Sequence, residues 1–141
     1  MSIHSIIEFG VNVEVSPSNV FRKLIECGWW VDLDGSAFLN IGDQDDWVSV
    51  KNVEYKYLSD WFLFADNSRK KCGCTFVHKK TEIGGIFLFD EDWKSFRWIV
   101  SVNRPIVDFC SRVTDYTACL ELIWPVIDGL GVDIETLSCS Q

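Results

Sequence analysis

Five aspartates close together are the residues of this chain that first suggest chemistry. They lie within residues 32–46, a stretch that contains no basic side chain. Carboxylates grouped in this way can bind a cation, take part in acid–base catalysis, or face a basic partner. A calcium-binding EF-hand loop needs glycine at its sixth position and glutamate at its twelfth. Counted from Asp32, Gly35 comes fourth and Asp43 twelfth, so the spacing argues against calcium.

The remaining residues offer little support for a metal centre or a catalytic site. Cys72, Cys74 and His78 are close in sequence, but C-x-C without a second cluster does not complete a four-ligand zinc site. His4 and His78 are the only histidines, and no P-loop, dinucleotide fingerprint or nucleophile elbow occurs. A Cys–His pair that uses His78 remains open, although no local signature supports it. We therefore expect no enzyme activity, no cofactor and no metal.

The composition is that of a folded chain with a single core. Of 141 residues, 48% are hydrophobic, 14% are aromatic and only three are proline, so we expect one domain over residues 1–141. The start of the sequence has no basic segment followed by an apolar one, and no run approaches the roughly 18 apolar residues of a membrane span. We expect a soluble cytoplasmic protein with reduced cysteines and with most of its seven tryptophans in the core.

Local patterns predict an α+β domain, built on a mostly antiparallel sheet with one helix near each end of the chain. Ser16-Pro17 predicts the start of a helix over 17–27, and Thr114 predicts the cap of a second helix that Pro125 interrupts. Asp34-Gly35 predicts a hairpin turn between two apolar runs. The strands expected from apolar alternation and β-forming residues cover 11–15, 29–33, 36–41, 47–50, parts of 53–64, 72–79, 85–89, 95–102, 104–110 and 132–137.

The charge of the chain indicates which partners suit it. The formal net charge is −8 and the sequence pI is about 4.6, which disfavours nucleic acid and anionic membrane and favours a basic protein. Residues 82–92 repeat the pattern of residues 32–46, with four acids and no base. Acids can steer a basic partner while nearby tryptophans anchor it. The candidate partner-binding residues are Asp34, Asp43, Asp45, Asp46, Trp47, Asp90, Glu91, Asp92 and Trp93.

A short, acidic, tryptophan-rich α+β chain of this kind resembles the immunity proteins of bacterial toxin systems, including contact-dependent growth inhibition. The segment Gly28–Gly35, followed by Ile41-Gly42-Asp43, is similar in style to N-terminal hairpins in some of these proteins. The resemblance implies an inhibitor that binds a cognate toxin, often a nuclease with a basic cleft, and blocks access of its substrate. It assigns no individual binding residue.

Two other classes of function are compatible with the sequence. One is a small enzyme or ligand-binding domain with an aromatic-lined pocket. The other is a different acidic blocker, such as a phage protein that mimics DNA. If the acidic surface is the interface, reversing Asp43, Asp45 and Asp46 to lysine should slow association and weaken its salt dependence, with little change in thermal stability.

Overall fold

The structure is a computed structural model that describes residues 4–42 and 47–141, and the α+β class expected from the sequence is confirmed. The helices within the described residues are α1 (Pro17–Glu26), α2 (Tyr55–Ser68) and α3 (Tyr116–Leu130). The strands are β1 (Ser5–Val11), β2 (Trp29–Trp30), β3 (Ala37–Ile41), β4 (Val48–Val50), β5 (Cys72–His78), β6 (Gly84–Phe89), β7 (Ser95–Val102), β8 (Ile106–Val107), β9 (Cys110–Thr114) and β10 (Ile134–Ser140).

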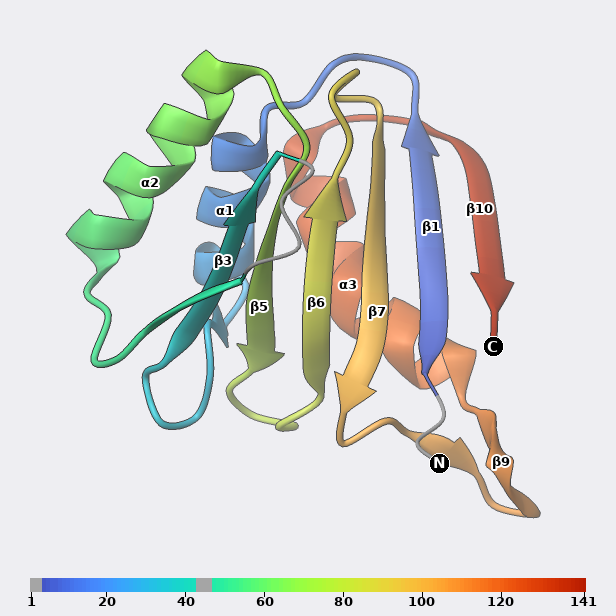
Figure 1. Ribbon diagram of the computed structural model, residues 1–141. Helices are drawn as coiled ribbons and strands as arrows, with labels where there is room; N and C mark the ends of the chain where they lie inside the picture. The colour runs from blue at the N-terminus through green and yellow to red at the C-terminus, as the bar shows by residue number, and fades with distance from the viewer. Residues whose placement is uncertain (1–3, 43–46) are drawn as a thin grey trace.

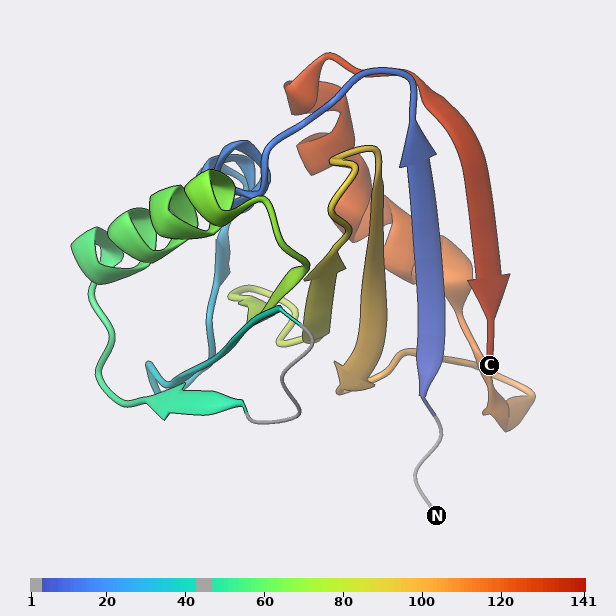
Figure 2. The ribbon, with the colours of Figure 1, turned by 45° about the horizontal axis from the view of Figure 1, so that its top comes forward.

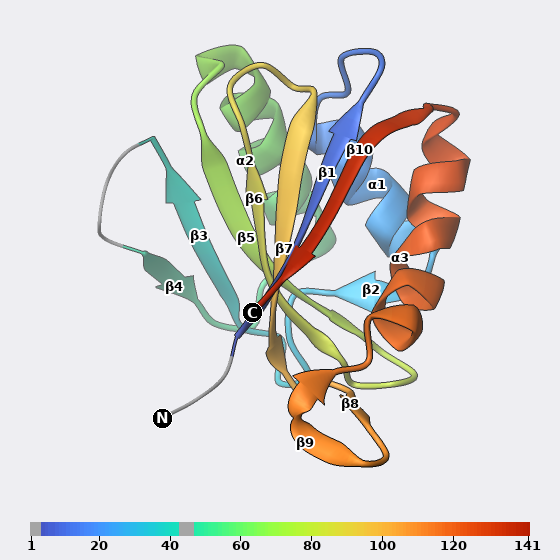
Figure 3. The ribbon, with the colours of Figure 1, turned by 90° about the vertical axis from the view of Figure 1, so that its right-hand side faces the viewer.

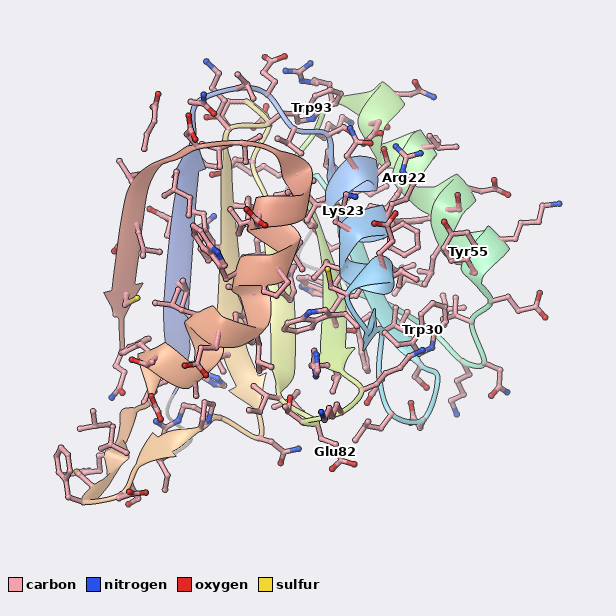
Figure 4. All side chains as sticks on the ribbon, turned by 180° about the vertical axis from the view of Figure 1, so that it is seen from behind. Arg22, Lys23, Trp30, Tyr55, Glu82 and Trp93 are labelled. Atoms are coloured by element: carbon pink, nitrogen blue, oxygen red, sulfur yellow. The ribbon has the colours of Figure 1, made fainter. Side chains whose placement is uncertain are left out.

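One antiparallel sheet organises the molecule (Figure 1). Its strands lie in the order β10-β1-β7-β6-β5-β3-β4, and β2 pairs with β5 beside β3. All three helices lie on one face, as the view from behind shows (Figure 4). The opposite face carries no helix of the described chain, and we call it the open face. The short strands β8 and β9 form a separate hairpin that projects beyond one end of the sheet (Figure 3).

The core lies between the sheet and the helices and consists largely of aromatic rings. Phe21 of α1 stacks on Phe62 of α2 with ring centroids 4.6 Å apart, and both rings approach Phe76 of β5. Trp98 of β7 stacks on Phe87 of β6 at 5.6 Å. Because these residues alternate along the strands with half-buried ones, each central strand directs one fully buried row of side chains towards the helices.

The elements with strong local signals are confirmed. The hydroxyl of Ser16 accepts a hydrogen bond from the backbone N–H of Asn19, and Pro17 occupies the first turn of α1. The hairpin of β5 and β6 and the full range of β7 also agree with expectation. The second cap is displaced by one residue, because Asp115 rather than Thr114 accepts from the N–H of Ala118.

The expected hairpin around Asp34-Gly35 is wrong in its pairing, although the turn exists. Gly35 has φ +82° and its N–H donates to the carbonyl of Asp32. However, β2 and β3 do not pair with each other. Both add to the same edge of β5, where Trp29 lies opposite His78 and Ile41 lies opposite Cys72. The free edge of β5 therefore outcompetes the local hairpin.

Four further expectations are corrected. Residues 53–64 form most of α2 instead of strands, because Leu58, Phe62 and Ala65 recur at helical spacing and are buried against the core. The first strand is Ser5–Val11 and not 11–15. Residues 104–110 leave the main sheet and enter the β8–β9 hairpin. Helix α3 continues through Pro125 to Leu130, because its face containing Ile123, Val126 and Ile127 packs into the core on both sides of the proline.

Candidate protein-interaction surface

The open face is a half-buried apolar surface crossed by a row of charges. Ile6, Ile99 and Ile86 lie opposite one another on β1, β7 and β6, so they form one row across the sheet. In the neighbouring row, Glu8, Arg97 and Leu88 stand opposite one another on the same three strands. Cross-strand neighbours are close enough for their side chains to interact. The strand register therefore builds an apolar row beside a partly charged one.

Trp47 lies on this open face. A β-carbon placed at Gly73 would come within 2.6 Å of Cη2 of Trp47 and 2.8 Å of Cδ2 of Leu88. Gly73 and Leu88 are paired residues of β5 and β6, on the side opposite the core residues Cys74 and Phe87. The indole ring thus rests where glycine leaves room for it, and 37% of the residue stays exposed. A large aromatic held this way is the type of residue that anchors protein interfaces.

Arg97 joins two carboxylates on the open face. Its Nη2 lies 3.6 Å from Oδ1 of Asp90, and its Nε lies 3.8 Å from Oε2 of Glu8. Asp90 and Arg97 also line a pocket of about 120 Å³ with Leu88, Asn40 and other residues. Ion pairs that are partly exposed, such as these, contribute little to folding stability. They leave two carboxylates positioned around Arg97, and a second base, Lys71, lines the same pocket as Asp90.

Three of the candidate partner-binding residues, Glu91, Asp92 and Trp93, lie in the turn that follows β6 and make contacts that hold this turn. The carboxylate of Asp92 accepts hydrogen bonds from the backbone N–H groups of Lys94 and Ser95, at 2.9 and 3.2 Å. Trp93 has φ +59°, and the guanidinium of Arg69 lies 3.7 Å from the centre of its ring. The backbone carbonyl of Glu91 accepts from Nε of Arg69, which leaves the exposed Glu91 carboxylate out of that contact. Asp92 and Trp93 therefore both have structural roles in this turn.

The structure does not bring all the predicted acids together. Asp34 lies in the turn before β3, where its carboxylate accepts from the backbone N–H of Ser36 at 2.8 Å. Asp90 follows β6, which runs antiparallel to β5, and Trp47 approaches the start of β5. Trp47 and Asp90 therefore lie at one end of the sheet, where the end of β3 pairs with the start of β5. Asp34 precedes the start of β3 and so lies at the other end of that strand, whose course Figure 1 shows. Asp43, Asp45 and Asp46 lie outside the described residues.

The cysteines and His78 are poorly suited to nucleophilic chemistry. Burial, with the Asp66 charge adding to it, raises the pKa of Cys72 to about 12, and burial raises the pKa of Cys74 well above its ordinary value. The pKa of Cys119 is also raised to about 12, chiefly by burial. His78 packs its ring against the edge of Trp29, and burial lowers its pKa. A thiolate is the reactive form of cysteine, so these three thiols are inert near neutral pH.

Exposed apolar side chains also occur away from the open face. Phe109, at the tip of the β8–β9 hairpin, is 88% exposed, and Tyr57, Leu63 and Phe64 project from α2. Trp124 of α3 is 54% exposed and lines an apolar groove beside β10. Trp30 is less available than these residues, because the amino group of Lys79 lies over its ring. On α1, the outward side carries the basic residues Arg22 and Lys23 (Figure 4).

Sequence reasoning missed Glu8 and Arg97. The alternation of Ile6, Glu8 and Gly10 with buried residues indicates a half-exposed strand at 5–11, whereas the alternation at 11–15 predicts a strand that does not form. Arg97 sat in a correctly predicted strand, yet nothing local indicates which acids meet it. Its partners come from β1 and from the end of β6, which are far apart in sequence.

Within residues 4–42 and 47–141, no group of three or more histidine, cysteine or acidic side chains is placed to hold a metal ion. None of the described helices is long and apolar enough to cross a membrane. Comparison of the chain with protein-family models, with curated proteins and with solved structures found no match.

Proposed function

We propose that this chain is an intracellular immunity protein, which binds and neutralises a cognate bacterial toxin. The toxin we propose is a nuclease with a basic cleft, and the binding surface is the end of the open face that carries Trp47, Asp90 and Glu8. The protein acts by binding and blocking, without catalysis of its own.

The position of Trp47 and Asp90 at the same end of the open face is the observation that supports this proposal. The indole is held above Gly73 and remains partly exposed, so it can enter a partner with little loss of conformational freedom. Asp90 and Glu8 flank Arg97, and a lysine or arginine of a toxin can replace Arg97 as their partner. The net charge of −8 steers a basic domain towards the protein from a distance.

The filled core favours binding by a surface over binding of a small molecule. The aromatic rings that suggested a pocket stack directly on one another, as the pairs Phe21–Phe62 and Phe87–Trp98 show. The apolar groove beside α3 is lined by neither histidine nor cysteine. An acidic blocker that mimics DNA would share the same surface and would differ only in its target.

Capture of the tagged protein from its native host, with mass spectrometry of the proteins that stay bound at moderate salt, tests the proposal. We expect one stoichiometric partner with a basic toxin domain. That domain should arrest growth when it is expressed alone, and co-expression of this chain should restore growth. If the captured partner is not toxic, or if this chain does not protect against it, the immunity function is wrong.

Variants then locate the interface. Trp47→Ala and Asp90→Lys should each weaken binding of the captured toxin about tenfold or more, because an anchor and a steering charge are lost. Asp60→Lys, which reverses an exposed acid on α2, is the matched control and should bind nearly as the wild type. If all three variants bind alike, the open face is not the interface, although the immunity function itself can still stand.

A further inference from the structure

The outer edge of the sheet at β10 has a second feature that bears on binding. Strand β10 pairs with β1 on one side only, and its other side faces no described strand or helix (Figure 1). Five consecutive residues, Thr136–Ser140, keep a regular register with β1, and all of them are exposed. An unpaired edge presents backbone N–H and C=O groups to any strand that can align with them.

Protein edges are commonly protected by lysine, proline or a bulge, and β10 has little of this protection. Its single charged residue is Glu135, and it contains no proline or lysine. A bulge interrupts the register next to Glu135, between Gly10 and Val11 of β1, but the five residues beyond it are regular. The opposite edge of the sheet is formed by β4, which has only three residues. The molecule thus has one long, regular edge among its described strands.

An apolar groove runs beside this edge on the helix side of the sheet. Figure 3 looks onto β10 with α3 next to it, and Figure 2 shows α3 lying behind β1 and β10. The groove has a volume of about 460 Å³ and lies between the two elements. Its main apolar lining residues are Phe9, Leu120, Trp124, Ile134 and Leu137. Trp124 and Leu137 are 54% and 47% exposed, so the groove presents uncovered apolar surface beside free backbone groups.

A sheet edge with a neighbouring side-chain groove suits an extended peptide segment. Backbone hydrogen bonds of the added strand supply affinity, and its alternate side chains enter the groove and supply specificity. On α3, Leu120 and Trp124 are one helical turn apart and line the groove. Cys119 and Ile123, each one residue earlier, are buried in the core. Helix α3 therefore contributes side chains to both the core and the groove. The groove therefore results from how α3 is rotated on the sheet.

The charge around the groove indicates the occupant. Glu121 lines the groove, Glu135 lies on the edge strand, and none of the described lining residues is basic. A second copy of this chain would bring another net charge of −8 to the same place, which is unfavourable. We propose that β10 and the β10–α3 groove bind an extended segment of another protein, with alternate apolar side chains and with lysine or arginine beside them. This proposal does not rest on the immunity function.

The test uses a phage-displayed library of random decapeptides, panned on the full chain at moderate salt. We expect enriched sequences that alternate apolar residues and carry a net positive charge. The enriched peptide, made synthetically, should slow hydrogen exchange of backbone amides in β10. Leu137→Lys and Trp124→Gln should each weaken its binding about tenfold or more, because each removes an apolar wall of the groove.

Phe64→Gln is the matched control, because Phe64 is a similarly exposed apolar residue on α2, away from the groove, and its replacement should leave binding unchanged. Melting curves check that every variant is folded. The proposal is overturned if no peptide is enriched on the wild type relative to Leu137→Lys. It is also overturned if the bound peptide protects no β10 amide, since a helix lying in the groove would give that result. Sedimentation showing a wild-type dimer that Leu137→Lys dissociates would assign the edge to a second copy instead.

Discussion

The two faces of the same central strands have very different environments, although both are rich in apolar residues. Trp98 and Phe87 are fully buried beneath the helices, whereas their chain neighbours Ile99 and Leu88 are only half-buried on the open face. The helices, and not the composition of the strands, create the difference. A strand that is apolar on both sides thus leaves apolar surface available for a partner wherever no helix covers it.

Truncation of residues on opposite faces should give the largest contrast. Trp98→Ala should lower the free energy of unfolding by about 3–5 kcal/mol, because it opens a cavity in a close-packed aromatic cluster. Ile99→Ala, one residue along the strand, should cost less than about 2 kcal/mol, because its side chain is already partly in water. Urea unfolding of both variants measures the contrast. Equal losses would mean that the open face is covered in solution.

A second prediction concerns the attachment of the helices that cover one face. Asp66 of α2 accepts hydrogen bonds from the hydroxyl of Ser18 and from its backbone N–H, the latter at 3.2 Å, at the start of α1. Asp66→Ala should lower the free energy of unfolding by about 2 kcal/mol, because the buried Ser18 loses a charged acceptor. Asp60→Ala on the same helix is the control and should change it by less than about 0.5 kcal/mol. Thermal melting compares the two variants.

A third prediction tests whether Trp47 belongs to the open face. Gly73→Ala should cost about 1 kcal/mol, because the new methyl group collides with the rings and side chains above it. It should also displace Trp47 and shift tryptophan fluorescence towards longer wavelength. The cost should shrink when Trp47 is first replaced by alanine, since one of the two close neighbours is then absent. If Gly73→Ala lowers the free energy of unfolding equally in the wild type and in the Trp47→Ala variant, the new methyl group collides with Leu88 and not with Trp47.

The smallest expected effect is a pH dependence of folding stability that arises from His78, on the helix side of the sheet. Burial beside Trp29 lowers the pKa of His78, with a smaller contribution from the charge of Lys80. The unfolded chain therefore binds a proton more readily than the folded one does. The stability contributed by neutral His78 is present above the ordinary histidine pKa of about 6.5, and it is lost as pH falls through the lowered value. His78→Asn should flatten the loss of stability as pH falls below about 6.5, measured by urea unfolding at each pH.

Elements with strong short-range signals were predictable from the sequence. Ser16-Pro17 caps α1 because the serine hydroxyl and the fixed proline φ act within a few residues. Strands β5, β6 and β7 carry dense β-forming residues between turns, so their ranges needed little tertiary information. The net charge of −8 likewise follows from the sequence alone, and the expectation of a basic partner rests on it.

Tertiary structure decided which of two plausible local structures won. Residues 53–64 contain aromatic residues that suit a strand, but burial of Leu58, Phe62 and Ala65 on one side favours the helix. The Asp34-Gly35 turn is local, yet its flanking strands pair with β5, because that edge offers both of them hydrogen bonds and a buried face. The candidate surfaces also depend on tertiary structure. Trp47 above Gly73, Arg97 between Glu8 and Asp90, and the groove between α3 and β10 each join segments distant in sequence, and only the strand order brings them together.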